Sequence, residues 1–306
     1  MNTNWVFIAL LAPLFWAIAN YIDKIVINRY LVSSITGAGS LIVFTGMTGF
    51  LVAAVIALIH GDIFSISYSD ALIIVTAGAM LVASFIPYLY ALQKDDPSVV
   101  VPLYQLIPVF SYFLGFIFLQ EELSFQQVIA GLIVIAGSIG ISLDLKRGFS
   151  LKIRTLSLMC LASLGVAVNY LVFKMIALEG NFWTTGFWEY MGAGIFGLGL
   201  LIFYKPYRIE FITLIKKNRL IVPSMNVLGE LLNLSAKLLM SFATLSAPLA
   251  VVTLINGLQP FIILVLGIIL TLVFPKLIQE DITKKTLIQR SFSSVVMFLG
   301  IYLLFK

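Results

Sequence analysis

The sequence predicts an all-α integral membrane protein with ten transmembrane helices, arranged as two inverted five-helix repeats. Of the 306 residues, 61% are hydrophobic and 11% are charged, too little charge for the surface of a soluble chain of this length. The apolar residues form runs of about 20 residues, long enough for a helix to cross the hydrocarbon core and without the alternation of a β-barrel. One pattern also occurs twice along the chain.

Ten apolar segments are separated by short polar ones. The first has no basic stretch before it and no small-residue cleavage site, so we expect a retained helix rather than a signal peptide. The two longest polar segments, 205–219 and 275–285, are too short for soluble domains and are expected to be connectors. The expected helices span residues 4–22, 35–59, 70–93, 97–119, 125–143, 155–176, 184–204, 220–243, 248–274 and 286–305.

The repeated pattern is clearest around two prolines. The segment PVFSYFLG from Pro108 agrees with PFIILVLG from Pro260 at its proline, leucine and glycine. Downstream, the acidic residues 121–124 (EELS) correspond in type to residues 280–283 (EDIT). Unrelated apolar helices rarely keep a proline, a glycine and an acidic turn in the same order. We therefore expect a duplicated unit.

The fronts of the two halves also correspond, because Asn20 and Lys24 in the first half match Asn169 and Lys174 in the second. Five is an odd number, so the second unit enters the membrane from the opposite side. This is the inverted-repeat plan of many secondary transporters. The expected division is a first repeat at 1–143, a connecting loop at 144–154 and a second repeat at 155–306.

Lysine and arginine mark one side of the expected membrane. They gather in the connectors that follow odd-numbered helices, such as 144–154 and 205–219, and do not occur in those that follow even-numbered helices. The positive-inside rule then places the odd-numbered connectors in the cytoplasm and both termini outside it. We expect a multi-pass protein of a cell membrane, the inner or plasma membrane of a prokaryote. Its lysine and arginine side chains are expected to contact anionic lipid headgroups rather than nucleic acid.

Short motifs along the chain resemble one known family. They are Trp16-Ala17 with Lys24, Leu89-Tyr90-Ala91-Leu92, Pro108-Val109-Phe110, Gly115, Glu121, Leu123-Ser124, Gln127, Gly131 and Gly137. On these residues the sequence is similar to the EamA family of the drug/metabolite transporter superfamily. The resemblance is clearer in the first half, because Arg290 and Ser291 stand near where the second half should have glycine, and an insertion precedes Glu280.

The resemblance implies a secondary transporter that moves a small organic metabolite or drug by alternating access, through a central cavity between the two repeats. Its partners would be a small-molecule substrate and membrane lipid, and assembly into a homodimer stays open. Many members of the family have both termini in the cytoplasm, whereas the charges of this chain indicate the opposite orientation.

The alternative function is an integral-membrane enzyme or flippase that acts on lipid-linked substrates. It would need a cluster of His, Asp or Arg at one membrane surface, and the sequence has no such cluster, catalytic triad or nucleotide motif. We therefore expect no enzyme. With one cysteine, Cys160, and one histidine, His60, we also expect no metal site and no cofactor.

Ionisable residues inside the expected helices are the main site candidates, because a charge in the hydrocarbon core is costly. Glu230, Asn233, Lys237 and Ser241 are spaced i, i+3, i+7 and i+11, so they share one face of the helix at 220–243. This polar face either lines the substrate path or forms a structural network with a neighbouring helix. The spacing alone leaves both interpretations open.

Polar residues just before the two repeated prolines are further candidates, because a proline bends a membrane helix and frees carbonyl groups near the bilayer middle. They are either substrate ligands or interhelical hydrogen-bond partners. The matching asparagines of the two fronts are candidates on the same terms. The full set of substrate-path candidates is Glu230, Asn233, Lys237, Tyr104, Gln105, Asn256, Gln259, Asn20 and Asn169.

Other residues are expected to be structural. Glu189 is expected to form an interhelical ion pair with Lys237 or Lys174. Glu121 and Glu122 precede the helix at 125–143, where negative charge suits a helix N-terminus, so we expect caps and topology markers rather than acid–base chemistry. Four glycines of the helix at 184–204 should let neighbouring helices approach closely: Gly192, Gly194, Gly197 and Gly199.

Overall fold

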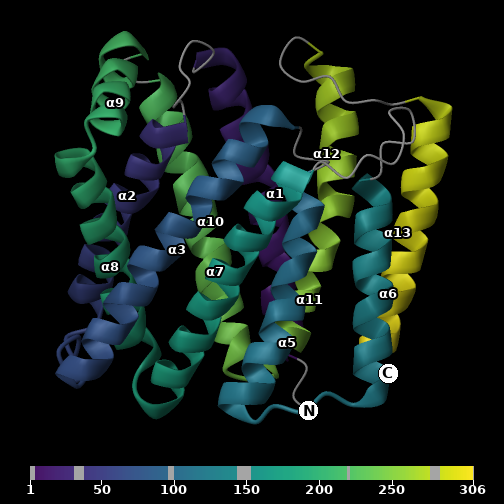
Figure 1. The fold of residues 1–306 in the computed structure, drawn as a ribbon, viewed down its shortest axis with the longest axis horizontal. Coiled ribbons are helices and arrows are strands. Elements are labelled where there is room, and N and C mark those ends of the chain that lie inside the picture. Colours follow the sequence, from purple (N-terminus) through teal and green to yellow (C-terminus); the bar gives the residue numbers. More distant parts are fainter. Residues whose placement is uncertain are drawn as a thin grey trace.

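The structure, a computed structural model of the chain, describes residues 4–30, 38–95, 100–142, 153–218, 221–275 and 283–305. The regular structure of these residues is helical, with no strand among them. Most helices run along one common direction (Figure 1). They are α1 (Asn4–Tyr30), α2 (Ala38–Ile59), α3 (Tyr68–Lys94), η1 (Val101–Gln105), α5 (Leu106–Leu119), α6 (Phe125–Ser142), α7 (Ile153–Glu179), α8 (Phe182–Phe203), α9 (Lys205–Asn218), α10 (Ile221–Thr244), α11 (Leu249–Leu254), η2 (Ile255–Leu258), α12 (Gln259–Val273) and α13 (Lys284–Phe305).

The chain is a multi-pass membrane protein. Among the described residues, eight helical segments are long and apolar enough to cross a membrane, and two shorter apolar segments comprise α5 and most of α6. A helix therefore lies at each of the ten apolar segments expected from the sequence. Large apolar side chains such as Phe7 and Phe203 stand exposed on the outside, at 71% and 86%. A membrane protein presents such side chains to lipid.

Two membrane segments are broken by a 3₁₀ turn at matching places. The turn η1 leads into α5, and η2 leads from α11 into α12. Pro108 and Pro260 lie in the first turn of the helix that follows each break. Each repeated proline thus follows a 3₁₀ turn, whereas the duplication and the inverted relation between the halves stay predictions. Residues 280–282 of the second acidic turn lie outside the described residues.

Neighbouring helices pack lengthwise in pairs. Helix α1 lies along α10 and α3 along α7, while α2 lies along α8 and α6 along α13. Gly46 of α2 and Gly197 of α8 face one another so closely that a Cβ on either would lie within 2.6 Å of the other's Cα. Gly192 and Gly194 also meet neighbouring helices closely, as expected, whereas Gly199 faces open space. Small residues thus bring α8 against α2 and α3.

Most of the expected connector at 205–219 forms the helix α9, which the sequence did not indicate. One face of α9 packs on α2, where the Phe211 ring lies 4.7 Å from the Phe44 ring. The Tyr207 hydroxyl is hydrogen bonded to that of Tyr90 at 3.0 Å, and burial raises the pKa of Tyr207. The apolar face was not recognised from the sequence because the basic residues of the segment lower its mean hydropathy.

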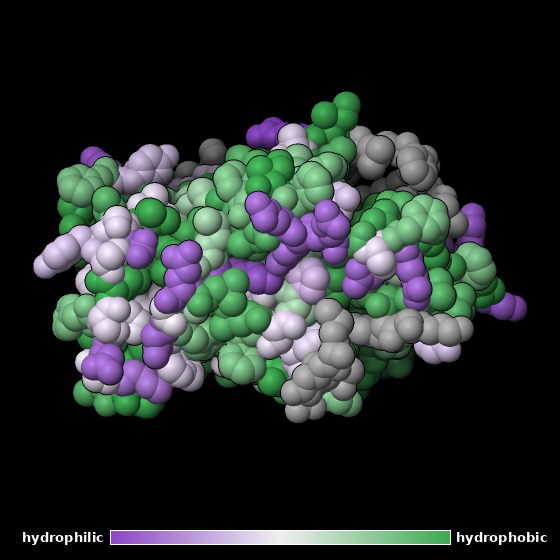
Figure 2. Space-filling view, turned by 90° about the horizontal axis from the view of Figure 1, so that it is seen from below, coloured by the Kyte–Doolittle hydropathy of each residue, from purple (hydrophilic) through white to green (hydrophobic). Residues whose placement is uncertain are grey.

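The two ends of the bundle differ in charge. The end that carries α9 and the start of α13 has exposed bases, among them Arg154 and Lys205. The opposite end has exposed acidic side chains, including Asp62, Glu122 and Glu179. Figure 2 shows this second end from below, with hydrophilic side chains gathered between apolar helix ends. We call them the basic end and the acidic end.

Candidate functional site

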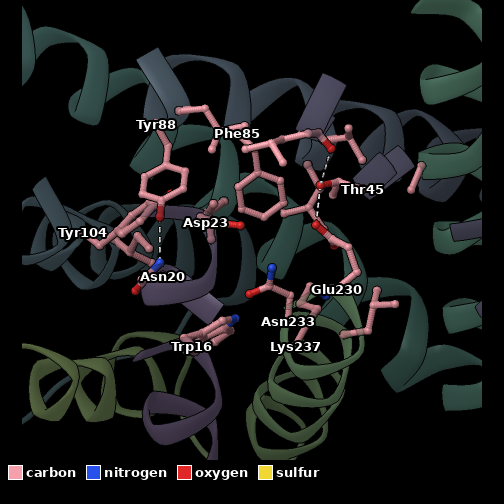
Figure 3. Close-up of a pocket in the computed structure, with 18 of the residues that line it drawn as sticks. Trp16, Asn20, Asp23, Thr45, Phe85, Tyr88, Tyr104, Glu230, Asn233 and Lys237 are labelled. Carbon is pink, nitrogen blue, oxygen red and sulfur yellow. Dashed lines mark hydrogen bonds between the residues drawn. The ribbon is translucent and has the colours of Figure 1, made fainter. Parts of the chain in front are cut away.

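A cavity lies inside the bundle, and its wall comes from helices of both predicted repeats. The cavity has a volume of about 110 Å³, which is room for several waters or a small organic molecule. Figure 3 shows the side chains that point into it. The polar and charged residues of its wall are Asn20, Asp23, Thr45, Tyr88, Tyr104, Tyr170, Tyr190, Glu230, Asn233, Lys237, Asn256 and Gln259.

A chain of hydrogen bonds runs along the wall from one half to the other. Gln259, the first residue of α12, donates to Oδ1 of Asn20 on α1 at 2.7 Å. Asn20 Nδ2 in turn donates to the Tyr88 hydroxyl of α3 at 2.7 Å (Figure 3). The Tyr88 ring lies 5.4 Å from the Tyr104 ring of η1. Both breaks therefore supply residues to the wall, and the amide chain fixes the position of its tyrosines.

Glu230 of α10 leaves part of its hydrogen-bonding capacity open to the cavity. Thr45 of α2 donates to its Oε1 at 2.5 Å, while Oε2 has no hydrogen-bond partner among the described residues. Asn256 Oδ1 and the Tyr190 hydroxyl, both buried in the same wall, also lack a partner there. Buried polar atoms are nearly always hydrogen bonded, so these three atoms mark the cavity as a place for a ligand or for water.

Lys237, by contrast, is paired within the protein. Its Nζ lies 3.0 and 3.2 Å from the two carboxylate oxygens of Glu189 and donates to Ser241 at 2.7 Å. Asn169 of α7 donates to the same Glu189 carboxylate at 2.7 Å. The ammonium also lies 4.9 Å from the centre of the Tyr170 ring, within the range of a cation–π contact. This network joins α7, α8 and α10, and it compensates both buried charges.

Lys174 pairs with Glu121 rather than with Glu189. Its Nζ lies 2.6 Å from Glu121 Oε1 and donates to the Ala247 carbonyl at 2.8 Å. The other oxygen, Oε2, accepts the Leu249 backbone N–H at 2.8 Å. The expectation that Glu121 caps α6, the helix that follows it, is therefore wrong. Its carboxylate ties the turn after α5 to α7 and to the start of α11.

The cap of α6 is made by other residues of the same turn. The Ser124 side chain accepts the Gln127 backbone N–H at 3.2 Å, and the Gln127 side chain accepts the Ser124 N–H at 2.9 Å. This reciprocal pair is a capping box, and it frees Glu121 for its ion pair. Glu122 is exposed.

Lys24 occupies the corresponding place near the basic end of the bundle. Its Nζ donates to the carbonyls of Leu92 at 3.4 Å and Asp95 at 3.2 Å, where α3 ends. The Asp95 carboxylate accepts from the Thr155 hydroxyl of α7 at 2.8 Å. The matching lysines Lys24 and Lys174 thus each bind backbone carbonyls at or just beyond the C-terminal end of a membrane helix, where the helix dipole favours a cation.

The structure brings together most of the substrate-path residues expected from the sequence. On the polar face of α10, Glu230 and Asn233 line the cavity, while Lys237 both lines it and belongs to the ion-pair network. That this face lies on a substrate path stays a prediction. Gln105 and Asn169 do not line the cavity, and Asn169 instead holds Glu189. The expected residues that line it are Asn20, Tyr104, Glu230, Asn233, Lys237, Asn256 and Gln259.

Asp23, Thr45 and Tyr190 also line the cavity, and the sequence did not predict them. Asp23 was missed because the first helix was expected to end at residue 22, which left this carboxyl in a surface connector, whereas α1 continues to Tyr30. A signal was present in the spacing, since Trp16, Asn20 and Asp23 follow the i, i+4, i+7 rule of one helix face. A single threonine in an apolar helix gives no comparable signal.

The model of the EamA-like transporter family matches residues 3–143. The first half of the chain is therefore similar to this family. No curated protein matches the chain. A solved structure titled "Crystal structure of protein" is similar to the chain at a TM-score of 0.67 and 11% identity, over 99% of this chain and 96% of that one. At this identity the likeness shows the fold alone, and it extends over both halves of the chain.

The Glu189→Gln variant is expected to lose about 3–5 kcal/mol of unfolding free energy, because it leaves Lys237 buried without a counter-charge. The double variant Glu189→Gln with Lys237→Met should recover most of this loss. Denaturant unfolding of the purified protein in mixed micelles, followed by tryptophan fluorescence, measures the difference. The control is Glu122→Gln, which removes an exposed carboxylate. Wild-type stability of the Glu189→Gln variant would contradict the buried pair.

Proposed function

We propose that this protein is a secondary transporter that moves a small organic solute across a cell membrane through the central cavity. The observation that carries the proposal is a polar cavity inside a bundle of membrane helices, lined from both halves of the chain. Polar groups within a membrane are costly and gather where solutes or ions pass. The match of residues 3–143 to the model of a transporter family supports the same conclusion.

Alternating access requires a closure on each side of such a cavity. Near the acidic end, Lys174 and Glu121 tie α7 to the turn after α5 and to the start of α11. Near the basic end, Lys24 ties α1 to the end of α3. In the proposed cycle these two ties open in turn, and the broken segments at η1 and η2 absorb the bending of the wall.

The proposed orientation places the basic end in the cytoplasm of a prokaryotic cell and both termini outside it. The uneven distribution of exposed bases between the two ends supports this orientation. Helix α13 runs from the basic end to the acidic end (Figure 1). The C-terminus therefore lies at the acidic end, which the proposed orientation places outside the cytoplasm.

Alkaline phosphatase fused after Lys306 is expected to be active, and green fluorescent protein fused there to be dark, because both would lie outside the cytoplasm. Fusions within the connector 144–154 serve as the control and should give the opposite pair of signals. Fluorescence from the fusion after Lys306 would overturn the orientation while leaving the transport proposal intact.

Filling the cavity is expected to abolish transport. Purified protein is reconstituted into vesicles loaded with a small-molecule extract of the host cells, and mass spectrometry of the outer medium follows release. At least one solute should leave wild-type vesicles faster than protein-free vesicles, and Asn233→Trp should remove this difference because its ring occupies the cavity.

The matched control is Leu231→Trp on the same helix, where the side chain is 56% exposed on the outside of the bundle. It should keep wild-type release. Release from Asn233→Trp vesicles at the wild-type rate, or equal release of every solute from wild-type and protein-free vesicles, would contradict the proposed function.

A further inference from the structure

The charges that face the cavity do not balance. Lys237 lines the wall, and Glu189 neutralises it. Two carboxyl groups remain, Asp23 from α1 and Glu230 from α10, and neither has a basic partner among the described residues. Figure 3 shows both side chains directed into the cavity. The described wall therefore carries an excess of carboxyl groups over basic ones.

The buried lysines of the same bundle, unlike these two carboxyl groups, have charged or carbonyl partners within the protein. Lys174 has the Glu121 carboxylate and a backbone carbonyl, and Lys24 has two backbone carbonyls. A buried charge without a partner costs several kcal/mol, and the chain avoids this cost at both lysines. Asp23 and Glu230 are therefore positions where the described residues leave room for a cation from outside the protein.

Unsatisfied acceptors point to the same kind of ligand. Glu230 Oε2 and Asn256 Oδ1 have no hydrogen-bond partner among the described residues, although Glu230 is 7% and Asn256 3% exposed. Both atoms accept hydrogen bonds and cannot donate them in the amide or the carboxylate form. A ligand that satisfies them must bring N–H or O–H groups, as a protonated amine does.

The rest of the wall suits the organic part of such a cation. Trp16, Phe85, Tyr88 and Tyr104 line the cavity as aromatic rings. Faces of aromatic rings attract organic cations, and Lys237 already uses Tyr170 in this way. An anion would meet two carboxyl groups here, and the one lysine of the described wall is held by Glu189.

We propose that the cavity binds a small protonated organic amine, with its ammonium group near Asp23 and Glu230 and its apolar body against the aromatic wall. This substrate class rests on the proposed transport function, since the same cavity is the solute path. Carboxyl groups from α1 and α10 thus act as the charge-selecting residues of the site.

Three probes of similar shape and different charge test the proposal: phenethylamine, 3-phenylpropanoate and 2-phenylethanol. Binding to the purified full chain in lipid nanodiscs is measured by titration calorimetry and by the ligand-induced rise in melting temperature. Phenethylamine should bind at least about tenfold more tightly than the other two. In the double variant Asp23→Asn with Glu230→Gln, its affinity should fall by about tenfold or more.

The matched control is Glu122→Gln, whose carboxylate is exposed outside the cavity and whose affinity for phenethylamine should not change. The single variants Asp23→Asn and Glu230→Gln replace the double variant if it does not fold, and each should weaken binding. Equal affinity for the three probes, phenethylamine binding that is unchanged in the carboxyl variants, or no phenethylamine binding to the wild type would overturn the amine proposal. In each of these cases the transport proposal would still stand if wild-type vesicles release a solute and Asn233→Trp abolishes that release.

Discussion

The need to compensate every charge inside the membrane is the constraint on which this structure depends. Water is not available there to solvate an ammonium or a carboxylate, so each must find a partner in the bundle. Glu189 and Lys237 meet this need across α8 and α10, with Asn169 of α7 as a third contact. Glu121 and Lys174 do the same near the acidic end. These ties fix which helices enclose the cavity.

The cavity is where the constraint is not met by the described residues. Its wall is held in place by an amide chain from Gln259 through Asn20 to Tyr88. Inside that frame, Asp23 and Glu230 have no basic partner among the described residues, and Asn256 keeps an unsatisfied acceptor. In the proposed transport site, the solute supplies the partner that these carboxyl groups and this acceptor lack, in a membrane that otherwise excludes it.

Hydrophobicity allowed the membrane segments to be located from the sequence. Each apolar run must be buried in the bundle or face lipid, whichever helices are its neighbours. Pairings across the bundle could not be obtained in this way. The sequence offered Glu189 two lysines, and only the packing of α7, α8 and α10 selects Lys237. Asp23 was assigned to a connector since hydropathy ends a helix at the first charges, although α1 continues beyond them. Glu121 was given a local role because its partner, Lys174, is 53 positions away in sequence.

The accessibility of position 233 tests most directly whether the cavity is a path for solutes. In a Cys160→Ser background, which removes the one native thiol, Asn233→Cys is treated with a membrane-impermeant thiol reagent in sealed vesicles and in opened ones. Asn233→Cys is expected to be labelled in one or both preparations and to be protected when a bound solute fills the cavity. Leu231→Cys on the lipid-facing side of α10 should stay unlabelled. Equal lack of labelling at both positions would contradict a water-accessible cavity between the two halves.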